Sequence, residues 1–316
     1  MIGRGFISAA IALLAIGAHQ SAQAGIIERK VTADHLVGLY VRSDEAPGKL
    51  PGVIVLGGSE GGLNAAVTAE ARALAAEGYA ALQLGYFGTA QLPETLQLIP
   101  VEYFERAVAW LQHQPDVDPH RIAIMGTSVG GEAALLVAAH DPAINAVIAA
   151  VPSDIVWQGI GPWGDRDPES SFSMDGRPLP DLPYRVSETG TVFDRYAAGL
   201  SARGAHRQAF IPLMKIQGPV MLVCGGRDVV WPSCRMARAA AARLRAGGFT
   251  HPVVLLAFPK AGHAVFGPPF AASDPAYAGL GALGGTAAAN DAARKTAWPR
   301  ALAFLKAAFH PSAGGF

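Results

Sequence analysis

The chain has 316 residues, of which 51% are hydrophobic and 16% charged, and this composition excludes an intrinsically disordered protein. Its 25 basic residues balance its 25 acidic residues, and no basic run or stripe stands out, so the sequence lacks the electrostatic footprint of a nucleic-acid-binding protein. The length fits one large α/β domain or two small ones. We therefore look for a function in a small-molecule pocket.

The N-terminal segment 1–24 has the pattern of a secretory signal peptide. Arg4 supplies a positive start, an apolar stretch runs from Phe6 to Ala18, and Ala22-Gln23-Ala24 is a small-residue cleavage signal. The apolar stretch is shorter than the roughly 20 residues that a membrane span needs. No later segment of the sequence is apolar for long enough, and no cysteine follows the cleavage site as it would in a lipoprotein. We expect cleavage after Ala24 and an exported protein, periplasmic or secreted, without a stable membrane span.

Short apolar runs then alternate with helical patterns along the rest of the chain. Residues 25–50 are too few for a second domain, and we expect them to add an edge strand at 36–41. Further strands are expected at 53–56, 80–84, 121–125, 146–151, 220–224 and 253–258, and helices at 63–77, 102–112, 130–140, 233–246 and 286–309. Continuous apolar strands separated by helices are typical of a parallel sheet covered on both faces. The sequence predicts a doubly wound, mostly parallel α/β fold with a single domain over residues 25–316.

One long segment, about 154–217, breaks this alternation. It contains Trp157 and Trp163, several prolines and glycines and many charges, without a clean period. Loops of this length inside a compact domain are usually functional lids or binding loops. We interpret it as a cap-like insertion that covers the substrate, with a solvated surface excursion as the alternative.

The two cysteines, Cys224 and Cys234, are too few for a disulfide scaffold and have no histidine at zinc spacing. Cys224 lies in an apolar strand-like run, which favours a buried core thiol. A Cys224–Cys234 bridge is the alternative if the compartment is oxidising.

The motif Gly126-Thr127-Ser128-Val129-Gly130 has the form G-x-S-x-G. It stands between an expected strand and an expected helix, which is the context of a nucleophile elbow: the serine is exposed on a tight turn and glycines leave room for it. The helix N-terminus also favours developing negative charge. Ser128 is therefore the candidate nucleophile, and the alternative is a serine that only caps the helix.

A serine nucleophile needs a base, and the order expected in this fold is Ser, then Asp or Glu, then His. Asp228 follows the strand at 220–224, and His263 follows the strand at 253–258. The carboxyl ends of parallel strands converge on one crevice, so we expect Ser128, Asp228 and His263 to meet there. No other histidine follows a strand in this way, and Asp154 is the competing acid.

Acyl transfer also needs donors for the oxyanion. One is the backbone N–H of Val129, directly after the nucleophile, and the second is expected from the loop after the first core strand, Gly57-Gly58-Ser59-Glu60-Gly61-Gly62. We expect the N–H of Ser59, or that of Glu60 next to it, to serve. This loop lacks the lysine of a P-loop and is not G-x-G-x-x-G, so nucleotide binding is disfavoured.

Together these residues resemble the catalytic domain of acyl-CoA thioesterases and bile acid-CoA:amino acid N-acyltransferase. The resemblance covers roughly residues 50–309 and is carried by Gly85–Gly88, Leu92-Pro93, Ile99–Phe104, Arg121–Leu136, Pro152–Gly159, Gly225–Trp231, Ala261–His263, Pro268–Phe270 and Gly284–Thr286. It implies an α/β-hydrolase fold similar to dienelactone hydrolase, and thioester cleavage by Ser128, Asp228 and His263. Serine at position 128 favours hydrolysis over the amidating branch of the family, which uses cysteine.

The sequence thus predicts a serine hydrolase that cleaves acyl thioesters through an acyl-enzyme, without a metal or an organic cofactor. One alternative is an exported carboxylesterase or dienelactone hydrolase-like enzyme. An alternative of another class is a non-catalytic exported binding protein whose insertion holds a ligand.

Overall fold

The structure is a computed structural model. It describes residues 25–45, 48–162, 165, 167–185, 190–271 and 273–310. The expected signal peptide and Trp163 lie outside the described residues.

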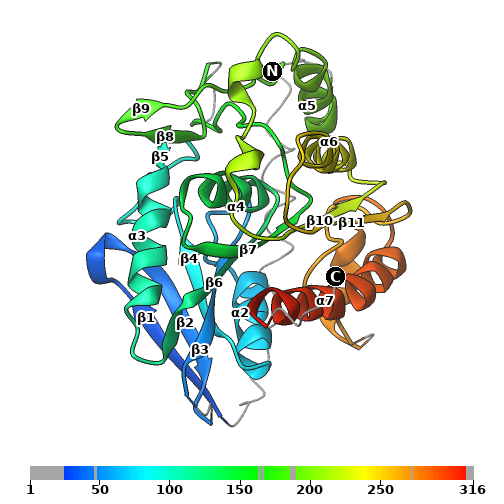
Figure 1. Ribbon diagram of the computed structural model, residues 1–316. Coiled ribbons are helices and arrows are strands. Elements are labelled where there is room, and N and C mark those ends of the chain that lie inside the picture. The colour runs from blue at the N-terminus through cyan, green and yellow to red at the C-terminus, as the bar shows by residue number, and fades with distance from the viewer. Residues whose placement is uncertain are drawn as a thin grey trace.

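An eight-stranded sheet forms the centre of the molecule (Figure 1). In sheet order its strands are β1 (Ile26–Val31), β2 (Val37–Ser43), β4 (Ala80–Gly85), β3 (Leu50–Leu56), β6 (Val117–Thr127), β7 (Ile144–Ala150), β10 (Val220–Gly225) and β11 (Val253–Phe258). Only the β1–β2 and β2–β4 pairs are antiparallel. The predicted doubly wound, mostly parallel α/β fold is confirmed.

The expected edge strand at 36–41 is not at the edge. It is β2, which pairs with β4 on one side and with β1 on the other. β1 escaped prediction because Glu28, Arg29 and Lys30 are exposed and no apolar run marks it. These charges are typical of an edge strand, where they discourage pairing with another chain.

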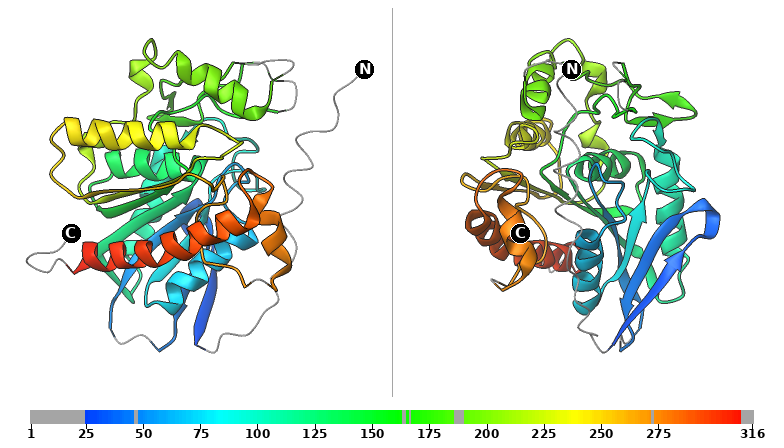
Figure 2. Two further views of the ribbon diagram at one scale, coloured as in Figure 1. Left: turned by 90° about the vertical axis from the view of Figure 1, so that its right-hand side faces the viewer. Right: turned by 180° about the vertical axis from the view of Figure 1, so that it is seen from behind.

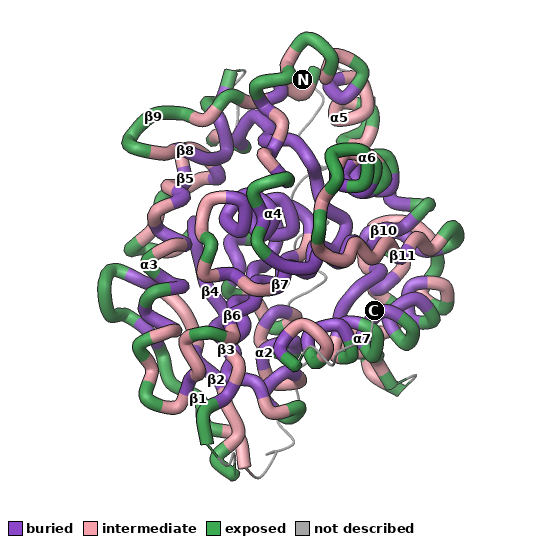
Figure 3. Tube along the Cα trace, viewed as in Figure 1, coloured by how far each residue is buried: buried purple, intermediate pink, exposed green. Residues whose placement is uncertain are grey.

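Helices cover both faces of the sheet (Figure 2). α2 (Ala65–Ala76) and α7 (Ala287–Phe309) pack on one face, and α3 (Val101–Gln112), α4 (Val129–His140) and α6 (Ser233–Ala246) on the other. Side chains of a strand alternate between the faces, so in β3 Val53 joins the core under α2 and α7, and Ile54 joins the other core. Buried residues follow the central strands, and exposed ones follow the outer side of α6 (Figure 3).

The insertion at 154–217 gathers at one end of the molecule, above α4 in Figure 1. It contains β8 (Phe172–Met174) and β9 (Arg177–Pro178), which form a small sheet with β5 (Ile99–Pro100), and the helix α5 (Val192–Ser201). The sequence did not predict α5, whose start is fixed by a capping box between Thr191 and Asp194. Short 3₁₀ turns follow at Arg207–Ala209 and Leu213–Lys215, and two more lie outside the insertion at Ala33–His35 and Pro275–Gly281.

Within the described part of the chain, none of the helices combines the length and the apolar character that crossing a bilayer requires.

Candidate active site

Ser128 occupies the sharp turn between β6 and α4. Its backbone has φ 61° and ψ −124°, a left-handed conformation that is strained for a residue with a side chain. The turn is tight enough that a Cβ at Gly126 would overlap the carbonyl of Gly130, and a Cβ at Gly130 would overlap that of Gly57. Glycine is therefore required at both flanking positions, as a nucleophile elbow demands.

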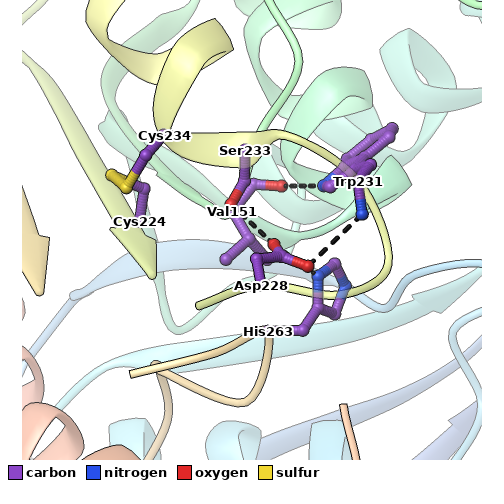
Figure 4. Close-up of a disulfide and its surroundings, with 7 residues drawn as sticks. All are labelled: Val151, Cys224, Asp228, Trp231, Ser233, Cys234 and His263. Carbon is purple, nitrogen blue, oxygen red and sulfur yellow. Dashed lines mark hydrogen bonds and ion pairs between the residues drawn. A yellow bond between two sulfur atoms is a disulfide. The ribbon is translucent and has the colours of Figure 1, made fainter. Parts of the chain in front are cut away.

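His263 and Asp228 lie together at the ends of neighbouring strands. Asp228 follows β10 and His263 follows β11, and the imidazole Nδ1 is 2.9 Å from Asp228 Oδ2 (Figure 4). Both residues are buried, as is Ser128. β6, which ends just before Ser128, is separated from β10 in the sheet by β7 alone. The three residues thus stand at the same, carboxyl-terminal edge of the parallel strands.

Asp228 is held by its own loop. Its Oδ1 accepts hydrogen bonds from the backbone N–H of Val230 at 2.9 Å and of Trp231 at 3.3 Å. Its Oδ2 accepts one from the Ser233 hydroxyl at 2.6 Å, besides the contact with His263. Three donors therefore fix the carboxylate in an orientation that presents Oδ2 to the imidazole.

The competing acid, Asp154, has different partners. Its Oδ2 lies 2.8 Å from Arg203 Nη2 and 3.1 Å from Arg243 Nη1, and the side chain is fully buried. Burial raises the pKa of this carboxyl, and the two guanidinium groups oppose that shift. Asp154 joins the insertion to α6, and Asp228 is the acid that contacts His263.

Trp231 is a site residue that the sequence analysis missed. Its ring centroid lies 6.4 Å from that of His263, and its Nε1–H donates to the carbonyl of Val151 at 3.0 Å. Tyr196 of α5 also packs edge-on against this indole, with centroids 5.5 Å apart. Trp231 therefore connects the insertion with the His263–Asp228 pair; the signal available in the sequence was its place three residues after Asp228.

The glycine-rich loop 57–62 lies against Ser128, because a Cβ at Gly58 would be 3.0 Å from the Ser128 Cβ. The Glu60 carboxylate folds back over this loop and accepts hydrogen bonds from Gly58 N–H at 2.8 Å and from Asn64 Nδ2 at 2.7 Å. Asn64 in turn caps α2. Gly58 N–H is thus occupied, whereas the described residues give the N–H of Ser59 no hydrogen-bond acceptor. Val129 is the first residue of α4, where the helix itself supplies no acceptor for the N–H.

Glu132, one turn into α4, is a buried acid beneath the elbow. Its Oε1 accepts the N–H of Trp157 at 3.0 Å, which links α4 to the insertion, while Oε2 is buried without a hydrogen-bond partner among the described residues. Burial raises the pKa of Glu132 well above its usual value, and Asp154 adds to the shift. Burial thus favours the neutral form of this carboxyl, the form that costs least to bury.

Cys224 and Cys234 form a disulfide with Cα atoms 5.0 Å apart (Figure 4). The interpretation of Cys224 as a buried free thiol was wrong, and the alternative, a bridge, is what the structure contains. The bridge joins the end of β10 to the start of α6 and closes the loop that carries Asp228 and Trp231. No group of three or more His, Cys, Asp or Glu side chains in the described ranges is arranged to hold a metal ion.

A mostly parallel sheet with a left-handed serine at a strand-to-helix turn, and a His–Asp pair after two later strands, defines the α/β-hydrolase class of proteins. The family follows from comparison with known sequences. The family model described as "BAAT / Acyl-CoA thioester hydrolase C terminal" matches residues 99–311, and the chain belongs to this family. The model of the dienelactone hydrolase family matches residues 37–159.

Curated relatives include human acyl-coenzyme A thioesterase 6, which is 31% identical over 84% of this chain and 62% of its own length. Human acyl-coenzyme A thioesterase 1 is 28% identical over 92% of this chain and 66% of its own length. Mouse acyl-coenzyme A amino acid N-acyltransferase 2 is 31% identical over 82% of this chain and 61% of its own. The alignments thus span between about three fifths and two thirds of these relatives.

Solved structures share the fold. A dienelactone hydrolase-like promiscuous phosphotriesterase from metagenomic libraries has a TM-score of 0.55 and 20% identity, over 90% of this chain and 100% of that one. The acylaminoacyl peptidase of Pyrococcus horikoshii has a TM-score of 0.62 and 14% identity, over 93% of this chain and 44% of that one.

Proposed function

We propose that this protein is a serine hydrolase that cleaves acyl thioesters of the acyl-CoA type through an acyl-enzyme on Ser128. The observation that carries the proposal is the strained Ser128 elbow at the same sheet edge as the buried His263–Asp228 pair. The family match and the thioesterase relatives support the substrate class.

The proposed chemistry gives each of the three residues one role. The Ser128 hydroxyl attacks the thioester carbonyl while His263 takes its proton, and Asp228, held by three other donors, orients the ring and stabilises the imidazolium. The tetrahedral intermediate collapses by breaking the C–S bond, and the thiolate leaves with the proton from His263. Water then attacks the acyl-enzyme with His263 as base, releasing the acid and restoring Ser128.

The oxyanion that forms in both steps is assigned to the N–H groups of Val129 and Ser59. Val129 follows Ser128 directly, and Ser59 follows Gly58, where a Cβ would lie 3.0 Å from the Ser128 Cβ. Neither N–H has an acceptor among the described residues. Glu60 is assigned a supporting place, since its carboxylate occupies Gly58 N–H and thereby fixes the loop. The loss of one oxyanion donor typically costs about 10²–10³-fold in rate.

The first test is a pre-steady-state burst with an activated ester. We expect the wild-type protein to release one equivalent of leaving group rapidly and to be labelled at Ser128 by a fluorophosphonate, because both reactions need an activated serine. Ser128→Ala should abolish burst and labelling. Ser201→Ala is the control, since this serine of α5 is exposed and lies outside the elbow, and it should keep both. An unchanged burst in Ser128→Ala contradicts the mechanism, and a folded wild-type protein without labelling supports the non-catalytic binding alternative.

A second candidate is a carboxylesterase or dienelactone hydrolase-like enzyme, favoured by the family match over residues 37–159. The two are separated by kcat/KM for acyl-CoA and p-nitrophenyl esters of equal chain length. We expect the acyl-CoA thioester to be preferred. A preference for the oxygen ester after correction for intrinsic reactivity contradicts the thioesterase assignment.

We also propose that the protein is exported, to the periplasm or outside the cell, with cleavage after Ala24. The signal-like pattern supports this, and so does the disulfide, because such bridges persist in oxidising compartments. N-terminal sequencing of the protein from a secretion-competent host should begin at Gly25. A cytosolic product that retains Met1 contradicts the proposal.

A further inference from the structure

The start of α7 is built into the loop that carries His263. Asn290, fully buried in the first turn of the helix, accepts a hydrogen bond from the N–H of Gly262 at 2.7 Å through its Oδ1. Its Nδ2 donates to the carbonyls of Leu280 at 2.7 Å and Gly284 at 2.9 Å. A single amide thus ties the residue before His263 to the segment before α7.

That segment also contacts the loop of the acid. Gly284 forms an isolated β-bridge with Asp228, and the N–H of His263 donates to the carbonyl of Leu283 at 3.0 Å. A Cβ at Gly284 would overlap the carbonyl of Arg227, and one at Gly262 would overlap the carbonyl of Gly284. The segment Leu283–Gly284 is therefore in backbone contact with the loop that carries His263 and with the loop that carries Asp228.

Arg294, one turn beyond Asn290, holds the chain on the other side of His263. Its guanidinium donates to the carbonyls of Ala264, Phe266 and Pro268, and it lies over the Phe270 ring at 4.8 Å. The side chain is only 8% exposed. A buried guanidinium without acceptors would cost much free energy, so Arg294 needs these three carbonyl groups. Its contacts with them therefore fix the path of residues 264–268.

We infer that Asn290 and Arg294 are positioning residues that set the imidazole of His263 against Asp228; this inference rests on the proposed function of the site. The physical reason lies in the sheet, because β11 pairs only with β10 among the described strands, so the loop after it has support from one neighbour. α7 supplies the second support: Asn290 acts just before His263 and Arg294 just after it. Neither side chain contacts the reacting atoms.

The test compares Asn290→Ala and Arg294→Lys with Leu305→Ala, a cavity-forming change at a fully buried position of the same helix, about four turns beyond Asn290. We expect the Asn290 and Arg294 variants to lower kcat by about 10- to 100-fold with KM changed less than about threefold, because small misplacements of a catalytic group have effects of this size. Arg294→Lys keeps the positive charge but removes the guanidinium group with its several N–H donors. We therefore expect it to lower kcat less than Asn290→Ala does. Leu305→Ala should lower the unfolding midpoint and leave kcat per folded molecule unchanged.

A second readout does not depend on turnover. We expect the proton between His263 Nδ1 and Asp228 to give a downfield ¹H NMR resonance, which is assigned by its loss in Asp228→Ala. This resonance should shift or broaden in the Asn290 and Arg294 variants and remain in Leu305→Ala. If wild type shows neither burst nor labelling, the proposed function fails, but this resonance still tests the positioning.

If Asn290→Ala does not fold, Asn290→Ser and Arg294→Lys decide the question. Folded variants at Asn290 and Arg294 overturn the inference if their kcat is within about twofold of wild type and their resonance is unchanged. So does an equal loss of kcat in Leu305→Ala, which would make the effect one of general stability.

Discussion

At the scale of single residues, one oxygen atom of the site has two partners. Asp228 Oδ2 receives hydrogen bonds from His263 Nδ1 and from the Ser233 hydroxyl. Ser233 is fully buried, so its hydroxyl serves the carboxylate and not the solvent. The serine limits the positions that the carboxylate can take beneath the imidazole.

We therefore predict that Ser233→Ala lowers the free energy of unfolding by roughly 1.5–3 kcal/mol, the usual size for a hydrogen bond to a charged group. The two backbone donors remain, so kcat/KM should fall less than in Asp228→Ala. Urea unfolding and steady-state kinetics measure both effects. Ser201→Ala, a change at an exposed serine of α5, is the control, and equal stability of Ser233→Ala and wild type would contradict the prediction.

A second residue-scale feature is the buried carboxyl of Glu70 on α2. Burial raises its pKa to about 7, while Arg294 lowers it and Glu60 raises it slightly. The folded-state pKa lies above the unfolded one, so the folded protein binds the extra proton between pH 4.5 and about 7. Its contribution to stability is full below that window and is lost as the pH rises through it.

We predict that the ionisation of Glu70 lowers the free energy of unfolding by roughly 2–4 kcal/mol between pH 4.5 and 8, at about 1.4 kcal/mol per pKa unit. Glu70→Gln should flatten this dependence, and Glu77→Gln, at an exposed position beside the same helix, should not. Chemical denaturation at several pH values is the measurement. A pH dependence unchanged in Glu70→Gln would show that the group does not titrate in this window.

At the scale of elements, the disulfide braces the turn between β10 and α6. Its cysteines are 10 residues apart, and the enclosed loop contains Asp228 and Trp231. Closing a loop of this length removes entropy from the unfolded chain.

We predict that reduction, or the paired change Cys224→Ser with Cys234→Ser, lowers the free energy of unfolding by roughly 2–3 kcal/mol. A reductant should lower the unfolding midpoint and the activity of wild type and leave those of the double variant unchanged. Equal sensitivity of both proteins would place the effect elsewhere.

Prediction from sequence worked where one apolar run marks one buried element. The helix at 233–246 and the strand at 253–258 match α6 and β11, and the three candidate site residues were found because each follows such a strand. Their catalytic roles stay predictions. The edge strand β1 was missed because its charged residues are exposed and hide the alternation of a strand. The helix α5 was missed because it is short and buries few residues, so its apolar residues show no clear helical period.

The supporting residues were harder to find for a different reason. Asn290 and Arg294 are polar residues of a helix, which ordinarily indicates a solvated face, and only the folded chain shows that they are buried against backbone carbonyls. The same holds for Glu132, an acid inside an otherwise apolar helix. Sequence patterns therefore identify candidate reactive groups more reliably than they identify the groups that hold those candidates in place.

At the scale of the whole molecule, the insertion and the helix α6 are joined by buried polar contacts as well as by apolar packing. Asp154 bridges Arg203 of the insertion and Arg243 of α6, and both guanidinium groups lie over the Phe210 ring. Removing one partner of a buried charge typically costs about 3–5 kcal/mol. The insertion is thus held in place at its first residue, near the strand ends that carry the candidate site.

The order of these residues along the chain has a consequence for biosynthesis. Ser128, Asp228 and His263 are all synthesised before Asn290 and Arg294. A nascent chain that has exposed His263 but not yet Asn290 therefore holds the three candidate residues without the contacts that align two of them. If α7 is the support inferred above, a released fragment that ends before Asn290 should lack hydrolytic activity although it contains all three candidates.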